Sequence, residues 1–271
     1  MGLRVPLVAH GPKVTLNMTD AERRFSRELD VFRTEGEAGI QCLFAYFSIH
    51  EVAREKKDVY ALLNKAPLFW NTCTSALQTA AYITLGRVFD QKSPHNIDRL
   101  LQQGQQNLQI FSKSALGKRK QGNNKAKPDW LDEYLSNAYV PTNDDFRRLR
   151  RHVSKYRRIY NANYKDIRDK WFAHKEVAGE MAEMALWSEG KGTNTELRRM
   201  FAFLNSMYDA LWHLFVNGRK PVLRQRRYSV ARIRKMRVSD SHLISVQEYI
   251  TCEVEQFLTS VAKSSLRRPT R

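Results

Sequence analysis

Three residues near the middle of the chain, Arg168, Asp169 and His174, have side chains that can move protons and hold a phosphate. A histidine titrates near neutral pH and can act as a general base or acid. An arginine stays charged and presents a planar fork that fits a phosphate, and a neighbouring aspartate can orient either group. Together they supply what is needed to cleave a phosphodiester that carries its own nucleophile, the 2′-OH of RNA.

The spacing from an arginine to a following histidine is weak evidence by itself. Similar spacings recur in three other pairs: Arg4–His10, Arg147–His152 and Arg237–His242. Arg168 differs because a small acid follows it, because Trp171 and Phe172 fill the gap, and because it ends the most basic stretch of the chain. A structural interpretation stays open: Arg168 and Asp169 would form surface ion pairs, and His174 would fill a polar niche beside Trp171.

The sequence contains no motif for a bound nucleotide and no local metal site. Glycine-rich phosphate loops are missing, and the seven histidines are scattered with no pair at ligand spacing. We therefore expect neither a cofactor nor a metal. The three cysteines, Cys42, Cys73 and Cys252, lie far apart, which favours a reducing compartment. No apolar run approaches the roughly 20 residues that cross a bilayer, and the N-terminus does not look like a signal peptide, so the cytoplasm is the expected location.

Apolar side chains recur at three- and four-residue spacing, which predicts an all-α fold, an antiparallel bundle with long helices. The helix start signals are Thr19 or Asp20, Pro67, Ser93-Pro94, Thr142, Thr193 and Asp240. Residues 112–128 lack a periodic apolar face and predict a solvated basic loop, and only residues 222–238 hint at a strand. The predicted organisation is an extension at 1–18, a helical bundle at 19–217, a basic connector at 218–238, and a C-terminal helix and tail at 239–271 that pack on the bundle.

The composition is strongly basic, with 46 Lys and Arg against 28 Asp and Glu and a net charge of +18. Such an excess favours a polyanionic partner, most often nucleic acid. The charge concentrates in the helix after Thr142 and in residues 218–238, which hold nine Lys or Arg and no acid. The second region is either an RNA-tracking arm, with Tyr228 available for stacking, or a solvated connector. The expected RNA contacts are Lys165, Lys170, Lys175, Arg224, Arg226 and Arg227.

The segment R-D-K-W-F-A-H at 168–174 resembles the R-polar-x(3–5)-H signature of the HEPN superfamily. Residues 89–101, FDQKSPHNIDRLL, place an FD near a helix end, then a serine and a helix with paired leucines. This arrangement is similar to the AbiU-type branch, which is linked to abortive phage infection. The resemblance implies a helical bundle that forms a homodimer, with the Arg–His turns of two chains facing each other. In active members it also implies metal-independent RNA cleavage.

By this resemblance, Arg168 would hold the scissile phosphate and stabilise its extra negative charge, His174 would serve as general base or acid, and Asp169 would position them. Some members carry, two residues after the histidine, a tyrosine that a partner nucleotidyltransferase modifies; Glu176 stands there in this chain. The implied function is an endoribonuclease acting as a toxin or phage-defence effector, with an antitoxin or regulatory protein as a candidate partner and no membrane partner. Two alternatives stay open: a non-catalytic helical module that binds RNA or a protein, and, with less support because no short helix-turn-helix pair is visible, a DNA-binding regulator.

Overall fold

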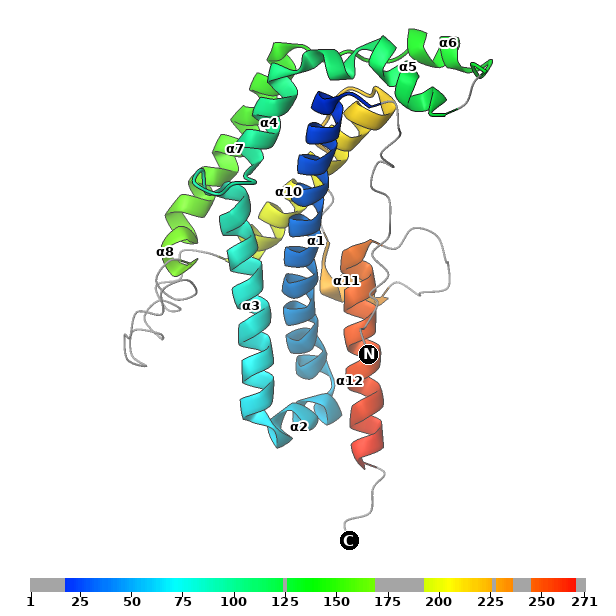
Figure 1. The fold of residues 1–271 in the computed structure, drawn as a ribbon. Coiled ribbons are helices and arrows are strands. Elements are labelled where there is room, and N and C mark those ends of the chain that lie inside the picture. Colours follow the sequence, from blue (N-terminus) through cyan, green and yellow to red (C-terminus); the bar gives the residue numbers. More distant parts are fainter. Residues whose placement is uncertain (1–17, 124–125, 169–192, 226–227, 236–244, 267–271) are drawn as a thin grey trace.

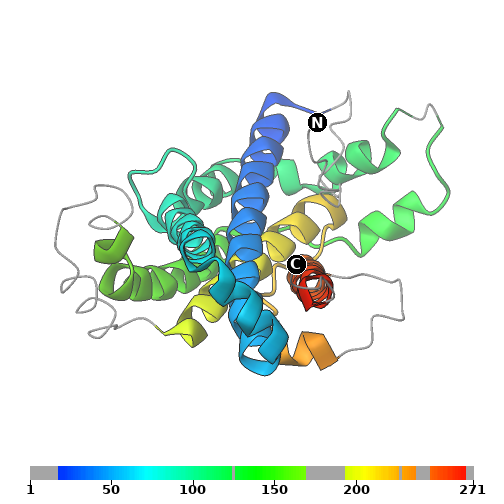
Figure 2. The ribbon, with the colours of Figure 1, turned by 90° about the horizontal axis from the view of Figure 1, so that it is seen from below.

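The computed structural model describes residues 18–123, 126–168, 193–225, 228–235 and 245–266, and every regular element in these ranges is helical. The longest helix, α1 (Asp20–Glu55), runs through the middle of the molecule (Figure 1). It is flanked by α3 (Pro67–Phe89) and α12 (Val246–Leu266), and α10 (Asn194–Asn217) crosses it (Figure 2). The short α2 (Lys57–Lys65) links α1 to α3. The predicted all-α fold is confirmed, and the described part of 222–238 contains no strand.

The core is built around α1. Thr19 and Glu22 form a reciprocal capping box at its start, as the sequence indicates. Gly39 marks a close crossing, because a Cβ there would lie 2.5 Å from Phe201 of α10 and 2.7 Å from Thr84 of α3. The predicted apolar stripe of α1 is buried: Phe25, Leu29, Phe32, Ile40, Leu43 and Phe47.

Two further helices, α4 (Ile97–Gln106) and α7 (Asn143–Asn163), pack against each other on one side of the bundle (Figure 1). Asn96 caps α4, and α7 begins where the backbone N–H of Thr142 donates to Oδ2 of Asp145 at 2.9 Å. At Tyr164 the chain leaves regular helical geometry, and a single further turn, α8 (Lys165–Ile167), follows. The inner face of α7 is buried: Phe146, Leu149, Val153, Tyr156 and Tyr160.

The prediction of a solvated loop at residues 112–128 was wrong for its first half. A helix, α5 (Lys113–Gln121), follows the 3-10 turn η1 (Leu108–Phe111) and precedes α6 (Leu131–Ser136). The reason is Arg119, whose guanidinium donates to the carbonyl oxygens of Ile110 at 2.8 Å and Phe215 at 2.9 Å and pairs with Glu22. This buried arginine ties α5 to the bundle, so the helix does not need an apolar stripe of its own.

The chain after α10 is also folded onto the bundle where the structure describes it. A short helix, α11 (Val230–Lys235), buries Val230 and Ile233. The residue after Ile233, Arg234, donates to Glu55 of α1 and to Glu255 of α12, each at 2.8 Å. At least part of the basic connector is therefore a structural element.

The helix α12 turns to the core a different face from the one that its apolar spacing predicts, which runs through Leu243, Val246, Ile250, Val254, Phe257 and Val261. It is described from Val246, whereas the start expected at Asp240 lies outside the described residues. Its buried side carries Thr251, which is bonded to Ser48 at 3.2 Å, while Phe257, expected in the apolar stripe, is 59 % exposed. The buried side also carries Leu258 and Ala262, each one residue after Phe257 and Val261, and apolar spacing alone does not show this offset.

Candidate active site

The side chain of Arg168, directly after α8, lies against the end of α3. Its Nη2 donates to Oδ2 of Asp90 at 3.1 Å, and both side chains are largely buried, being 17 % and 22 % exposed. The backbone N–H of Arg168 donates to the carbonyl oxygen of Tyr164 at 2.9 Å, which fixes the root of the side chain. The described partner is thus a residue 78 positions earlier on another helix, rather than a neighbour on an open surface.

Two residues of α3 form the seat of Arg168. Gly86 and Asp90 are four positions apart, so they lie on the same side of the helix end. A Cβ at Gly86 would collide with Cδ and Nη1 of Arg168. The arginine therefore crosses α3 at the one position of this face that has no side chain, and Asp90 holds its guanidinium beyond that point.

The surroundings of Asp90 favour its ionised form. The backbone N–H of Lys92 donates to Oδ1 at 3.0 Å, while Oδ2 accepts from Arg168. The Lys92 hydrogen bond above all, then Arg168 and the charge of Lys165, hold the pKa of Asp90 below its usual value. At neutral pH this group is a carboxylate that orients a cation, and it is not a proton carrier.

Aromatic rings underlie the seat. The guanidinium carbon of Arg168 lies 6.0 Å from the ring centroid of Tyr160, and that ring stacks on Phe89 with centroids 5.9 Å apart. Burial raises the pKa of Tyr82 to about 12, and burial also raises the pKa of Tyr164. Both hydroxyls stay protonated at neutral pH, so a general base must be another residue.

The start of α10 is tied to the end of α7 beside this seat. The hydroxyl of Tyr164 lies 3.2 Å from the carbonyl oxygen of Thr193 and 3.2 Å from Oε2 of Glu196. Asn163 donates to the same Glu196 oxygen at 3.1 Å. The predicted Thr193–Glu196 capping box is confirmed, and it also joins two helices. Residues 165–168 and 193–196 are therefore anchored to the same part of the bundle.

Only part of the predicted motif falls in the described ranges. The structure places Arg168 and Lys165, and Lys165 is exposed one turn before the arginine. The remaining predicted residues of this region lie outside the described residues: Asp169, Lys170, His174 and Lys175. The pairing of Arg168 with His174 stays a prediction.

Sequence reasoning missed the pairing of Arg168 with Gly86 and Asp90. Two signals were present: the FD pair at 89–90, and a glycine four positions before Asp90 on the same helix face. Neither signal shows which arginine arrives there. Arg157 also reaches this helix end, since its Nε donates to the carbonyl oxygen of Phe89 at 3.1 Å. The three-dimensional fold assigns Arg157 to the backbone and to Asp98, and Arg168 to Asp90.

The second basic region meets α7 at one described point. Arg224 is exposed, and the next residue, Gln225, donates to the hydroxyl of Tyr156 at 2.6 Å. The ring of Tyr228, expected to be available for stacking, packs edge-on against Phe44 with centroids 6.4 Å apart and is half-buried, so the core already uses it. Two more predicted RNA contacts, Arg226 and Arg227, lie outside the described residues.

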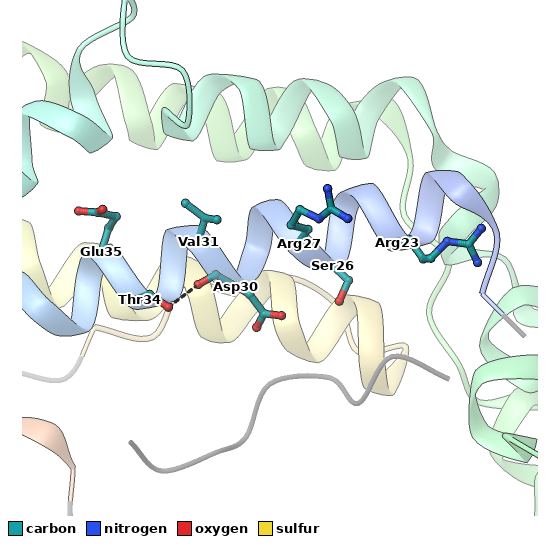
Figure 3. Close-up of a pocket in the computed structure, with 7 residues that line it drawn as sticks. All are labelled: Arg23, Ser26, Arg27, Asp30, Val31, Thr34 and Glu35. Atoms are coloured by element: carbon teal, nitrogen blue, oxygen red, sulfur yellow. Dashed lines mark hydrogen bonds between the residues drawn. The ribbon is translucent and has the colours of Figure 1, made fainter. Parts of the chain in front are cut away.

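A hollow of about 500 Å³ lies elsewhere, along the N-terminal half of α1. Figure 3 shows that its labelled side chains spread along a single helix, and Thr34 donates back to the carbonyl oxygen of Asp30 at 2.9 Å. Glu35 of this set is paired with Arg87 of α3 at 3.1 Å. Side chains that diverge from one helix do not form a convergent site, so this hollow is a weaker candidate than the seat of Arg168.

Comparison with known families decides the relationship. The sequence profile of the family HEPN_AbiU2, described as AbiU2, matches residues 23–232. The chain belongs to the HEPN AbiU2 family. The match spans both sides of the seat, Asp90 as well as Arg168, and the family makes this AbiU2 protein an abortive-infection-associated HEPN protein. No curated protein and no solved structure is detectably similar to it.

Within the described residues, none of the helices is both long and apolar enough to cross a bilayer.

Proposed function

We propose that this AbiU2 protein is a metal-independent endoribonuclease that acts in the cytoplasm as a toxin or phage-defence effector, using Arg168 and His174 at a dimer interface. The seat of Arg168 is the observation that carries the proposal. An ion pair that serves stability alone would need only the carboxylate of Asp90. Here α3 also has a glycine, Gly86, at the point where the arginine crosses it. A held, oriented guanidinium in a chain with a net charge of +18 is suited to a phosphate.

The proposed reaction needs no external reagent. His174 removes the proton from a ribose 2′-OH, whose oxygen attacks the adjacent phosphorus. The bond from phosphorus to the 5′ oxygen breaks, and an acid protonates that oxygen as it leaves. The products are a 2′,3′-cyclic phosphate and a 5′-OH, so no water is consumed and no electrons are transferred. Arg168 neutralises the charge that develops on the phosphoryl oxygens, and Asp169 positions the two groups.

Asp90 enters this scheme as a positioning residue. A guanidinium has five N–H donors in a fixed plane, and one of its terminal nitrogens faces Asp90. Holding that nitrogen restrains where the rest of the guanidinium can lie. Lys165 adds positive charge at the same place, while the other predicted contacts contribute affinity and no chemistry: Lys170, Lys175, Arg224, Arg226 and Arg227.

A homodimer is part of the proposal. One histidine cannot readily serve as both the base and the acid of a single cleavage event, and a twofold axis would supply a second His174. Light scattering should then give about twice the chain mass of 31.7 kDa. A strictly monomeric protein with full activity would contradict this arrangement.

The decisive experiment is cleavage of total RNA by the purified protein in EDTA. His174→Ala should lose at least about 10² in rate, and Arg168→Lys should also fail, because a point charge does not replace a planar fork. His152→Ala is the matched control, since His152 follows another arginine but sits on the exposed face of α7. Parental cleavage by the His174 variant, with retained helical circular dichroism, would refute the catalytic role and leave a non-catalytic HEPN module that binds RNA or a protein.

A further inference from the structure

Six of the seven Lys and Arg residues of α7 fall into two groups, and the seventh, Arg150, is partly buried. Three of them are committed to carboxylates: Arg147 to Asp144 at 2.8 Å, Arg148 to Asp145 at 2.6 Å, and Arg157 to Asp98. Arg151, Lys155 and Arg158 are exposed, and none of them has an ion pair or a side-chain hydrogen bond within the described residues. The unpaired cations therefore form a group that the fold itself does not use.

These three cations share one side of the helix. Their spacings of four and three residues place Arg151, Lys155 and Arg158 within about 60° of one another. From Phe146 to Lys165 the sequence contains no acid, so no carboxylate of α7 interrupts the stripe. Beyond the break at Tyr164, Lys165 is exposed in the single turn α8, and Arg168 follows three residues later. Figures 1 and 2 show α7 and α8 on the outer flank of the bundle.

A neighbouring histidine reports the positive potential along this face. Partial desolvation, followed by the charges of Lys155, Arg148 and Arg151, lowers the pKa of His152. On the inner face of α7, Gln225 of the second basic region is bonded to the hydroxyl of the buried Tyr156, and Arg224 beside it is exposed.

We propose that Arg151, Lys155 and Arg158 are a phosphate-contacting track that leads single-stranded RNA along α7 to the seat of Arg168. This inference rests on the proposed function, because it assigns the route by which the substrate reaches that site. A single strand fits better than a duplex: the track is one helix wide, and attack by a 2′-OH in line with the leaving oxygen requires a strand that can bend.

The track should be indifferent to base sequence. The two tyrosines in the middle of α7, Tyr156 and Tyr160, are buried, so the exposed face of this part of the helix offers charges and, apart from the imidazole of His152, no ring on which a base can stack. Contacts to phosphates alone fix the path of the strand but carry no sequence information. Any choice of cleavage sequence must come from residues nearer the site.

The test compares two triple variants that remove the same charge. One is Arg151→Gln, Lys155→Gln and Arg158→Gln; the control is Arg24→Gln, Lys57→Gln and Lys263→Gln, three exposed cations of α1, α2 and α12. Binding of a labelled single-stranded RNA is measured by anisotropy over a range of salt, in a His174→Ala background. Each phosphate contact contributes about 0.7 to the slope of log affinity against log salt, so the track variant should reduce the slope by about 2.

The expected result is at least about tenfold weaker binding by the track variant, equal for several RNA sequences, with the control within about twofold of the parent. An unchanged slope, or an equal loss in the control, would overturn the track. So would tighter binding of duplex RNA, duplex DNA or vesicles containing anionic lipid than of the single strand. The measurement does not depend on cleavage: a protein that shows the predicted binding pattern but never cuts RNA would refute the nuclease and retain the RNA path.

Discussion

Replacing Gly86 with alanine separates a catalytic role of the Arg168 seat from a purely structural one. In a helix interior, alanine is more favourable than glycine by about 1 kcal/mol, so the substitution stabilises the helical backbone of α3. The new methyl group would collide with Cδ and Nη1 of Arg168, which are outer atoms of a long side chain. The arginine can therefore yield by a shift on the order of 1 Å to restore van der Waals contact, at little cost to folding.

That shift is large on the scale of catalysis. Misplacing a catalytic group by about 1 Å can cost roughly 10² in rate. We expect Gly86→Ala to keep its helical circular dichroism, to melt between the parental temperature and about 2–4 °C above it, and to cleave RNA roughly a hundredfold more slowly. Single-turnover cleavage at saturating RNA, beside thermal unfolding, measures both quantities on one preparation.

Two other glycines of the bundle serve as controls. Gly36 of α1 has no atom within 4 Å of an added Cβ, so Gly36→Ala should gain similar stability and keep the parental rate. Gly39→Ala should lose stability, because its methyl group meets the buried side chains of Phe201 and Thr84. If Gly86→Ala folds and cleaves at the parental rate, the position of Arg168 does not limit the reaction and the proposed role of the seat is refuted.

Three further predictions concern Asp90, Glu255 and Tyr228. Asp90→Asn should cleave at least about tenfold more slowly with an unchanged fold, since a neutral amide holds the Arg168 guanidinium less firmly than a charge-assisted bond; single-turnover rates measure this, and a parental rate would contradict it. Hydrogen bonds from Arg234, and also from Lys56, lower the pKa of Glu255 from 4.5 to about 2, so its stabilisation is fully present above about pH 5 and is lost as the pH falls toward 2. In urea unfolding, Glu255→Gln should be less stable than the parent at pH 7, with a difference that shrinks between these limits; a difference independent of pH would be evidence against this. Tyr228→Ala should cost about 1–2 kcal/mol of unfolding free energy and leave the salt dependence of RNA binding unchanged, and the opposite pattern would restore a stacking role.

Local signals predicted the helices well wherever a cap and an apolar stripe agreed. The Thr193–Glu196 box and the start of α7 at Thr142 are both where the sequence places them. The prediction failed at α5, whose anchor is Arg119: its partners lie 97 residues earlier at Glu22 and 96 later at Phe215, so no local pattern reveals it. The register of α12 was missed for a similar reason, because its buried positions, Thr251, Leu258 and Ala262, depend on packing against distant helices.

The candidate site, like the fold, could be predicted only in part from the sequence. The sequence pointed to Arg168 through its acidic neighbour and its basic helix, and to residues 89–90 through the FD pair. It could not join them, because a pairing across 78 residues depends on how α3, α7 and α8 pack. The sequence also predicted that Tyr228 is available for stacking, because its neighbours are polar. In the structure its ring packs against Phe44.

The position of α1 has a consequence for how the protein is made. The first helix is completed by its contacts with the last, and the Ser48–Thr251 bond spans 203 residues. At translation rates of 5–20 residues per second, the ribosome needs about 10–40 s to go from the end of α1 to the end of α12. During that interval the α12-facing side of α1 has no native cover, so a nascent chain is exposed to chaperones and proteases, and a truncated one lacks a closed bundle. Synthesis of α12, rather than synthesis of Arg168, is then the step after which the bundle around α1 can close.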